Sequence, residues 1–211
     1  MHEDEAVSGS WRRIDSWLAA YAPAELALLN PPASGEEIEA AGREIGAELP
    51  AGLTASLRWH NGGDAESRLL PAASPLGAAG IRDAWRLRMD LADEDLLAAE
   101  PGEEPWWHPH WVPWAQTASG DLLVVDQRPG PGQGRLGRAV HDGCGSFTGS
   151  WPGVAAYLSA LAEVLYGGGA LDGWRLFTTV DQRLWWDRVP DARQLHGSPL
   201  TPAPVGIPDE G

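Results

Sequence analysis

Residues 111–141 restrict the fold most, because they predict three strands joined by two tight turns. Trp111–Ala115 and Leu122–Asp126 are apolar segments on either side of Ser119-Gly120, and this arrangement predicts an antiparallel hairpin. The sequence RPGPGQG that follows predicts a second turn, after which residues 135–141 predict a third strand. The segment therefore predicts an antiparallel sheet of at least three strands.

Amphipathic helices are predicted before and after this segment from the spacing of apolar residues. Ser34 and Glu37 have the spacing of a capping box, and Gly46 is a stop signal for the same helix. The other predicted helices begin at Ser10, Pro50, Ala79 and Ser150 and end near Tyr21, Asn61-Gly62-Gly63, Met89 and Gly167-Gly168-Gly169. Further predicted features are a short strand at Arg68–Leu70, a hairpin from Trp174 to Trp186 and a disordered Pro-rich tail from Pro199.

The composition indicates a globular protein with a large aromatic core. A length of 211 residues favours one domain with a tail. The chain holds twelve tryptophans, and each can bury about 150–250 Å² of surface, so most of them are expected in the core. No run approaches the length of a membrane span, and MHEDEAVSGS lacks the basic start and apolar run of a signal peptide. We therefore expect a cytoplasmic protein.

Candidate chemical sites are weak. The candidate ligands are His60, His108, His110 and His141, with Asp126. His108 and His110 would lie on one side of an extended backbone, but no spacing in the chain matches a known metal motif. Cys144, the single cysteine, lies in a glycine-rich turn without the helix N-terminus or cation that activates a thiol. The chain has no lysine, which excludes Schiff-base chemistry and a P-loop. The sequence therefore predicts no catalytic residue, no metal site and no cofactor.

The charge distribution favours a basic protein as partner. Thirty acidic and fifteen basic residues give a net charge of −15, which argues against direct binding of nucleic acid. Residues 89–104, MDLADEDLLAAEPGEE, hold seven acidic residues and no basic one, and two tryptophans follow. The predicted partner-binding residues are Asp90, Asp93, Glu94, Asp95, Glu100, Glu103, Glu104, Trp106 and Trp107. The alternative, of equal weight, is a solvated loop without a partner.

The order of motifs resembles the SUKH superfamily, which includes the fungal Smi/Knr regulators of cell-wall assembly. The resemblance is carried by IEAAGREIGAELPAGLTASLRWHNGG and by WVPWAQTASGDLLVVDQRPGPGQGRL, and it covers roughly residues 10–165. The matching positions are Pro32, Glu37, Leu49-Pro50, Leu53, Asn61-Gly62-Gly63, Pro113, Gly120-Asp121, Asp126, Gly130 and Gly134. It implies an α+β fold in which helices flank an antiparallel sheet.

The resemblance also implies a function, since bacterial members are commonly immunity proteins that bind polymorphic toxins, many of them nucleases. We accordingly expect a non-enzymatic immunity protein with a basic toxin as partner and no membrane contact. A regulatory adaptor of the Smi/Knr type is the alternative, and a small-molecule or glycan binder is a weaker one. The expected organisation is a domain over 10–165, an extension over 166–198 that packs on it, and a disordered tail over 199–211.

Overall fold

The computed structural model describes residues 2–92, 98–99 and 101–206 of the chain. Its helices are α1 (His2–Tyr21), α2 (Pro23–Leu26), α3 (Gly35–Ile45), α4 (Ala51–Leu57), α5 (Ala78–Leu91) and α7 (Val154–Gly167). Its strands are β1 (Ala73–Pro75), β2 (Trp111–Thr117), β3 (Leu122–Asp126), β4 (Leu136–Ala139), β5 (Arg175–Thr179), β6 (Leu184–Asp187), β7 (Gln194–Leu195) and β8 (Ser198–Pro202). The strands form two antiparallel sheets, so the α+β class is confirmed.

The first sheet contains the predicted strands in the order β1-β2-β3-β4. β2 and β3 pair with Trp111 opposite Asp126, and Gly120 has a φ of +91° in the turn that joins them. Both faces of this sheet are buried. Val112 and Val125 contribute to the main core, whereas Leu122 and Val124 belong to a second, smaller core with Trp111 on the opposite face. A tryptophan next to β2 can therefore be buried by packing on this second face of the sheet.

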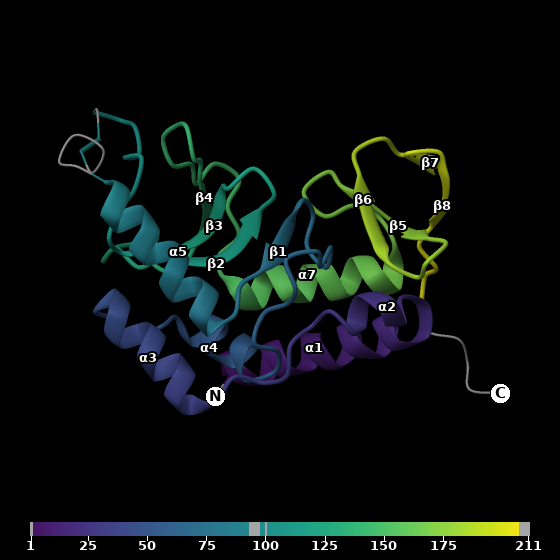
Figure 1. Ribbon diagram of the computed structural model, residues 1–211, viewed down its shortest axis with the longest axis horizontal. Coiled ribbons are helices and arrows are strands. Elements are labelled where there is room, and N and C mark those ends of the chain that lie inside the picture. Colours follow the sequence, from purple (N-terminus) through teal and green to yellow (C-terminus); the bar gives the residue numbers. More distant parts are fainter. Residues whose placement is uncertain (1, 93–97, 100, 207–211) are drawn as a thin grey trace.

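Helices α1 and α7 form a layer against the two sheets (Figure 1), whereas α5 packs against the second core on the other face of the first sheet. α7 runs beneath both sheets, and α1 lies along α7 on the side away from them. Apolar residues at helical spacing on α1, including Ile14, Trp17 and Leu18, are fully buried because they face this packed layer. α3 packs instead against α5, at one end of the molecule. The described residues contain no helix that is both long and apolar enough to cross a membrane.

Helix ends follow the sequence signals in part. The capping box of α3 is confirmed, because Ser34 Oγ accepts from the Glu37 amide at 3.2 Å and the Glu37 carboxylate accepts from the Ser34 amide at 2.8 Å. Gly46 ends this helix with a φ of +77°. Two predicted starts are wrong. α1 begins at His2, and Ser10 lies inside it with its hydroxyl bonded to the Ala6 carbonyl. α7 has Gly153, not Ser150, as its N-cap.

The chain after residue 165 forms the second sheet, with the order β6-β5-β8-β7. β5 and β6 are the predicted hairpin. The disordered tail was expected to begin at Pro199, but the structure places Ser198–Pro202 in strand β8, which pairs with β5. A proline-rich segment can do this because Pro199 and Pro202 lie near the ends of a short strand. Residues 207–211 lie outside the described part. The short strand predicted at Arg68–Leu70 is also displaced, since β1 begins at Ala73.

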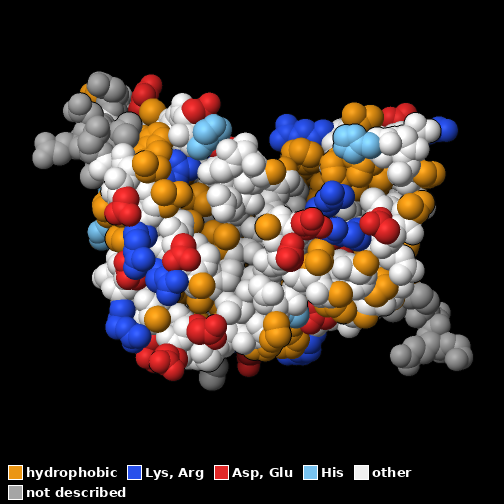
Figure 2. Space-filling model, in the orientation of Figure 1, with side chains coloured by type: hydrophobic (Ala, Val, Ile, Leu, Met, Phe, Trp, Pro, Cys, Tyr) orange, Lys and Arg blue, Asp and Glu red, His pale blue; other side chains and the backbone are white. Residues whose placement is uncertain are grey.

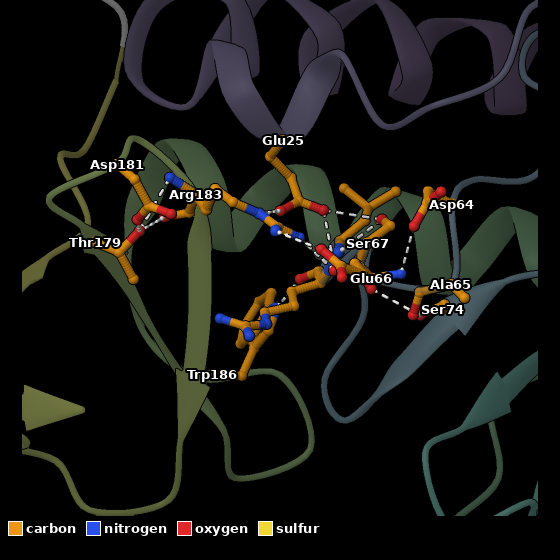
Figure 3. A network of polar contacts seen from close by, with 12 residues as sticks. Glu25, Asp64, Ala65, Glu66, Ser67, Ser74, Thr179, Asp181, Arg183 and Trp186 are labelled. Carbon is orange, nitrogen blue, oxygen red and sulfur yellow. Dashed lines mark hydrogen bonds and ion pairs between the residues drawn. The ribbon is translucent and has the colours of Figure 1, made fainter. Parts of the chain in front are cut away.

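A polar network joins the second sheet to the rest of the molecule (Figure 3). Glu25 on α2 is fully buried and accepts from the Ser67 hydroxyl at 2.8 Å and the Arg68 amide at 2.6 Å. Arg183, at the start of β6, lies 3.6 Å from the Glu25 carboxylate and also pairs with Glu66 at 3.3 Å. The Glu25 carboxylate thereby holds both the loop after α4 and the β5–β6 hairpin.

Candidate interaction surface

The acidic segment begins at the exposed end of α5. Asp90 is exposed there, and Glu103 is exposed on the far side of the segment. Asp93, Glu94, Asp95 and Glu100 lie outside the described residues. In Figure 2, acidic side chains flank the grey segment at the upper left, while acidic and basic side chains alternate over α3 and α5 below it. Among the described residues of the predicted site, the exposed acidic side chains are therefore those near its two ends, Asp90 and Glu103.

Glu104 takes part in an ion-pair cluster at the base of this segment. Its two oxygens accept from Arg128 at 2.6 and 3.1 Å, and one of them also lies 3.3 Å from Arg135. The same two arginines bind Asp126, which is almost fully buried at the end of β3. Each carboxylate thus bridges both guanidinium groups. Glu104 is already neutralised within the chain, so it contributes less to an external field than its charge suggests.

Asp126 needs these arginines because it is buried. Desolvation alone would raise the pKa of its carboxyl group, but hydrogen bonds from the Arg128 guanidinium and amide outweigh this and lower the pKa. The same contact with Asp126, followed by that with Glu104, raises the pKa of Arg128. The cluster fixes the turn between β3 and β4, where Gly134 N–H donates to the Asp126 carbonyl at 2.7 Å. This ion-pair cluster therefore has a structural role, because it holds the turn in place.

Asp121 forms a second buried cluster at the opposite end of β3. Its carboxylate accepts from Arg138 and from the His141 amide, the latter at 2.9 Å, and the His141 ring lies 2.7 Å away. Burial would raise the pKa of Asp121, but the two contacts with His141 and the one with Arg138 depress it far below its usual range. The cluster holds the loop after β4, whose His141 carbonyl accepts from the indole of Trp106 at 3.1 Å.

The two tryptophans of the predicted site differ sharply in exposure. Trp106 is half-buried and lies over Arg88, whose guanidinium carbon is 4.7 Å from the ring centroid. Trp107 is 0 % exposed and packs edge-on against Trp111 at 5.8 Å in the second core. The assignment of Trp107 as an exposed anchor is therefore wrong for this conformation, because the ring covers the sheet. Trp106 remains the one aromatic candidate of the predicted set.

The histidines and Cys144 do not assemble into a chemical site. His108 accepts from the His110 amide at 3.0 Å, and burial lowers the pKa of His108. No cluster of three or more His, Cys, Asp or Glu side chains suited to a metal occurs among the residues that the structure describes. Cys144 is exposed as a free thiol.

His60 has a structural environment between α1 and the loop at Asn30. Its Nε2 lies 3.0 Å from Asp15, and its Nδ1 lies 2.9 Å from the Asn30 carbonyl. Burial of the ring lowers the pKa of His60, but the hydrogen bonds to Asp15 and Asn30 and the charge of Asp15 together raise it above the ordinary value. The ring also packs edge-on against Trp11.

Sequence reasoning missed Arg128 and Arg135, which pair with Glu104 and Asp126, and Arg88, which packs on the ring of Trp106. Arg88 is buried at the end of α5 and donates to the Gly120 carbonyl at 3.0 Å. The contacts of Arg88 with Gly120 and of Arg128 and Arg135 with Glu104 join residues 24 to 32 positions apart, so no local pattern signals them. The net charge of the segment alone did not separate paired from exposed carboxylates.

Comparison with models of protein families gives a match. The model of the SMI1 / KNR4 family (SUKH-1) matches residues 32–160, which are well over half of the 211-residue chain. The matched region runs from just before α3 into α7 and contains the whole first sheet. The helices α1 and α2 and the second sheet lie outside it. No curated protein matches the chain.

Proposed function

The chain belongs to the SMI1 / KNR4 family (SUKH-1), and on this premise we propose that it is a non-enzymatic protein-binding module of the immunity type. The proposed partner is a polymorphic toxin with a basic surface, and a nuclease is the first candidate. A nuclease must present cationic side chains to phosphates. An acidic protein that covers those side chains blocks the substrate site without any chemistry of its own.

The observation that carries the proposal is the concentration of carboxylates between Asp90 and Glu104. Seven acidic side chains lie in this stretch without a basic one. Glu104 pairs with Arg128 and Arg135 outside the stretch, whereas the other six have no basic residue within it and repel one another. Asp90 and Glu103 are exposed and form no ion pair among the described residues. A cationic surface would relieve that repulsion, so the segment gains more from a basic partner than from water.

Trp106 supports the proposal as an anchor beside the carboxylates. Its ring is held by the Arg88 guanidinium on one face and by a hydrogen bond to the His141 carbonyl. A side chain that is already fixed loses little conformational entropy on binding. Tryptophan is also among the residues that most often dominate the energy of an interface.

The test is a kinetic one, made on the partner that an affinity capture from the native host identifies. The variant Asp93→Asn/Glu94→Gln/Asp95→Asn should associate more slowly and with a weaker salt dependence, because charges at a rim steer the encounter. Trp106→Ala should instead dissociate faster, by an amount equivalent to about 2 kcal/mol or more. Co-expression with a toxic partner should restore growth for the wild type and less so for Trp106→Ala.

A matched control removes the same formal charge from other faces. Glu5→Gln/Glu36→Gln/Asp191→Asn changes three exposed residues that lie on α1, α3 and the loop before β7. If both triple variants slow association equally, only the net charge matters and the acidic segment is not the binding surface. A partner that is bound but harmless would favour the regulatory adaptor of the Smi/Knr type over an immunity protein.

A further inference from the structure

A cleft of about 770 Å³ separates the first sheet from the second. It lies between β1 and the end of β2 on one side and β6 on the other, with the loop of residues 63–72 along it. Figure 2 shows the surface hollowed between the two halves of the molecule. Clefts that bind ligands commonly have volumes of about 300–1,000 Å³. The space is thus large enough for a short segment of another chain.

Tryptophans line this cleft to an unusual degree. Trp174, Trp185 and Trp186 contribute to its wall from the second sheet. An adjoining chamber of about 330 Å³ shares Trp174 with it and adds Trp114 and Trp151. Five of the twelve tryptophans in the chain therefore line the cleft or the chamber beside it, partly outside the region matched by the family.

Two arginines stack on these tryptophans, Arg68 in the cleft and Arg188 in the adjoining chamber. Arg68 lies 4.9 Å from the ring centroid of Trp185, and Arg188 lies 4.8 Å from that of Trp174. Within the described residues, neither guanidinium group forms an ion pair. These two groups can therefore accept an external anion, in a protein that is otherwise strongly acidic.

The carboxylates of the same cleft already have partners. Glu66 pairs with Arg183, and Asp172 accepts from the indole of Trp151 at 3.1 Å. The charge of Glu66 is thus partly balanced by Arg183, and Asp172, in the adjoining chamber, is held by a neutral indole. Arg68 and Arg188 form no ion pair among the described residues. Charge complementarity selects an occupant that carries carboxylates.

The geometry of β6 indicates an extended occupant. β6 is an edge strand of the second sheet, and in the described part of the chain its only backbone partner is β5. Its Trp185 and Trp186 line the cleft. An exposed strand edge can accept the main chain of an extended peptide, while pockets beside it receive alternate side chains.

We propose that this cleft binds an extended acidic peptide segment of another protein, which adds to the edge of β6, packs apolar side chains on the tryptophans and places carboxylates on Arg68 and Arg188. The site is distinct from the acidic surface that begins at Asp90 and does not depend on the function proposed for it. Nucleic acid is disfavoured as an occupant, because two free guanidinium groups would face a net charge of −15.

The test uses isothermal titration calorimetry with the full chain. The probe is a short peptide of alternating valine and aspartate with acetylated and amidated ends. It should bind, whereas the peptide with lysine in place of aspartate and a short oligothymidylate should not. A version with N-methylated valines should lose most of its affinity, because it cannot pair with a strand edge. Equal binding of the lysine peptide or tighter binding of the oligonucleotide would overturn the proposal, as would failure of the acidic peptide to bind.

Point variants locate the site. Arg188→Gln and Arg68→Gln should each weaken the acidic peptide by about tenfold or more, since each removes a charge-assisted hydrogen bond. Arg175→Gln serves as the control, because Arg175 is exposed on β5 outside the cleft. Unchanged melting temperatures establish that the variants fold. If Arg188→Gln and Arg175→Gln bind the peptide equally, the cleft is not the site.

Discussion

Asn61 links two helices through one side chain. Its Oδ1 accepts from the Ala78 amide at 2.7 Å and so caps α5, and its Nδ2 donates to Glu37 on α3 at 3.4 Å. Gly62 follows with a φ of +68°, and a Cβ on it would lie 2.2 Å from the Gly77 nitrogen. The motif Asn-Gly-Gly therefore serves close packing of the chain, which no other residue at position 62 would permit.

Protonation of His60 should make stability depend on pH. Its pKa is raised in the folded protein, so its contribution is fully present below the unfolded value of about 6.5 and is lost as the pH rises through the higher folded pKa. The free energy of unfolding of the wild type should thus fall relative to His60→Asn between about pH 6 and pH 9. Urea titrations at both values measure this.

The control for this experiment is His196→Asn, which changes an exposed histidine in the turn between β7 and β8. Its free energy of unfolding should follow the wild type at both pH values. A constant difference between His60→Asn and the wild type across the pH range would show that the contact with Asp15 does not involve a charged ring.

Truncation of Trp107 should destabilise the protein, because the side chain fills the second core. Trp107→Ala should lower the free energy of unfolding by about 3–5 kcal/mol, which corresponds to a melting temperature lower by about 6–20 °C in a chain of this size. Trp106→Ala should cost less, since that ring is partly exposed already. Thermal melts that rank the two variants in the opposite order would contradict the assignment of Trp107 to the core.

At the scale of single elements, α3 depends on its first turn. It is short, it packs mainly against α5, and its N-terminal amides are satisfied by the capping box of Ser34 and Glu37. The charge of Glu37 also favours the N-terminal end of the helix dipole. The hydrogen bonds to the Ser34 backbone and side chain lower the pKa of Glu37.

Removal of the α3 cap should lower the free energy of unfolding, whereas the same serine-to-alanine change within α1 should not. Ser34→Ala should lower the free energy of unfolding by about 1 kcal/mol. Ser16→Ala makes the same chemical change within α1, where the exposed Ser16 hydroxyl bonds only to the Arg12 carbonyl, and it should be neutral or slightly stabilising. Equal losses for the two variants in urea titrations would mean that the cap contributes nothing.

Elements with local signals were predictable from the sequence. α3, α5 and the β2–β3 hairpin were found because capping residues, apolar spacing and turn residues act within a few positions. β8 was missed because it pairs with β5, whose residues lie more than twenty positions earlier in the chain. The proline content of the segment favoured a disordered tail instead. Trp107 was misplaced for a related reason, since only the pairing of β2, β3 and β4 creates the face that it covers.

For the molecule as a whole, the junction at Glu25 adds polar contacts to the apolar packing that holds the second sheet on the main core. Glu25 is fully buried, and one of its oxygens has Arg183 as its nearest cation at 3.6 Å. The Trp186 indole also donates to the Arg68 carbonyl at 2.9 Å across the same junction. Arg68 and Trp186 of this junction also line the cleft between the two sheets.

Loss of Arg183 should leave a buried charge without its partner. Arg183→Met should lower the free energy of unfolding by about 3–5 kcal/mol, and Glu25→Gln/Arg183→Met should recover part of the loss. Arg43→Met is the control, because its pair with Glu39 is exposed on α3 and should contribute little. A double variant no more stable than Arg183→Met would show that the buried charge is not the cause.

The return of the chain to its first helix has a consequence for how the protein is made. The indole of Trp17, which is fully buried, donates to the carbonyl of Pro204, 187 residues further along. A ribosome that adds about 5–20 residues per second needs about 10–40 s to cover that distance. Throughout this interval the first helix has an unfinished apolar face, so the nascent chain should need a chaperone or another transient cover until residues 203–206 emerge.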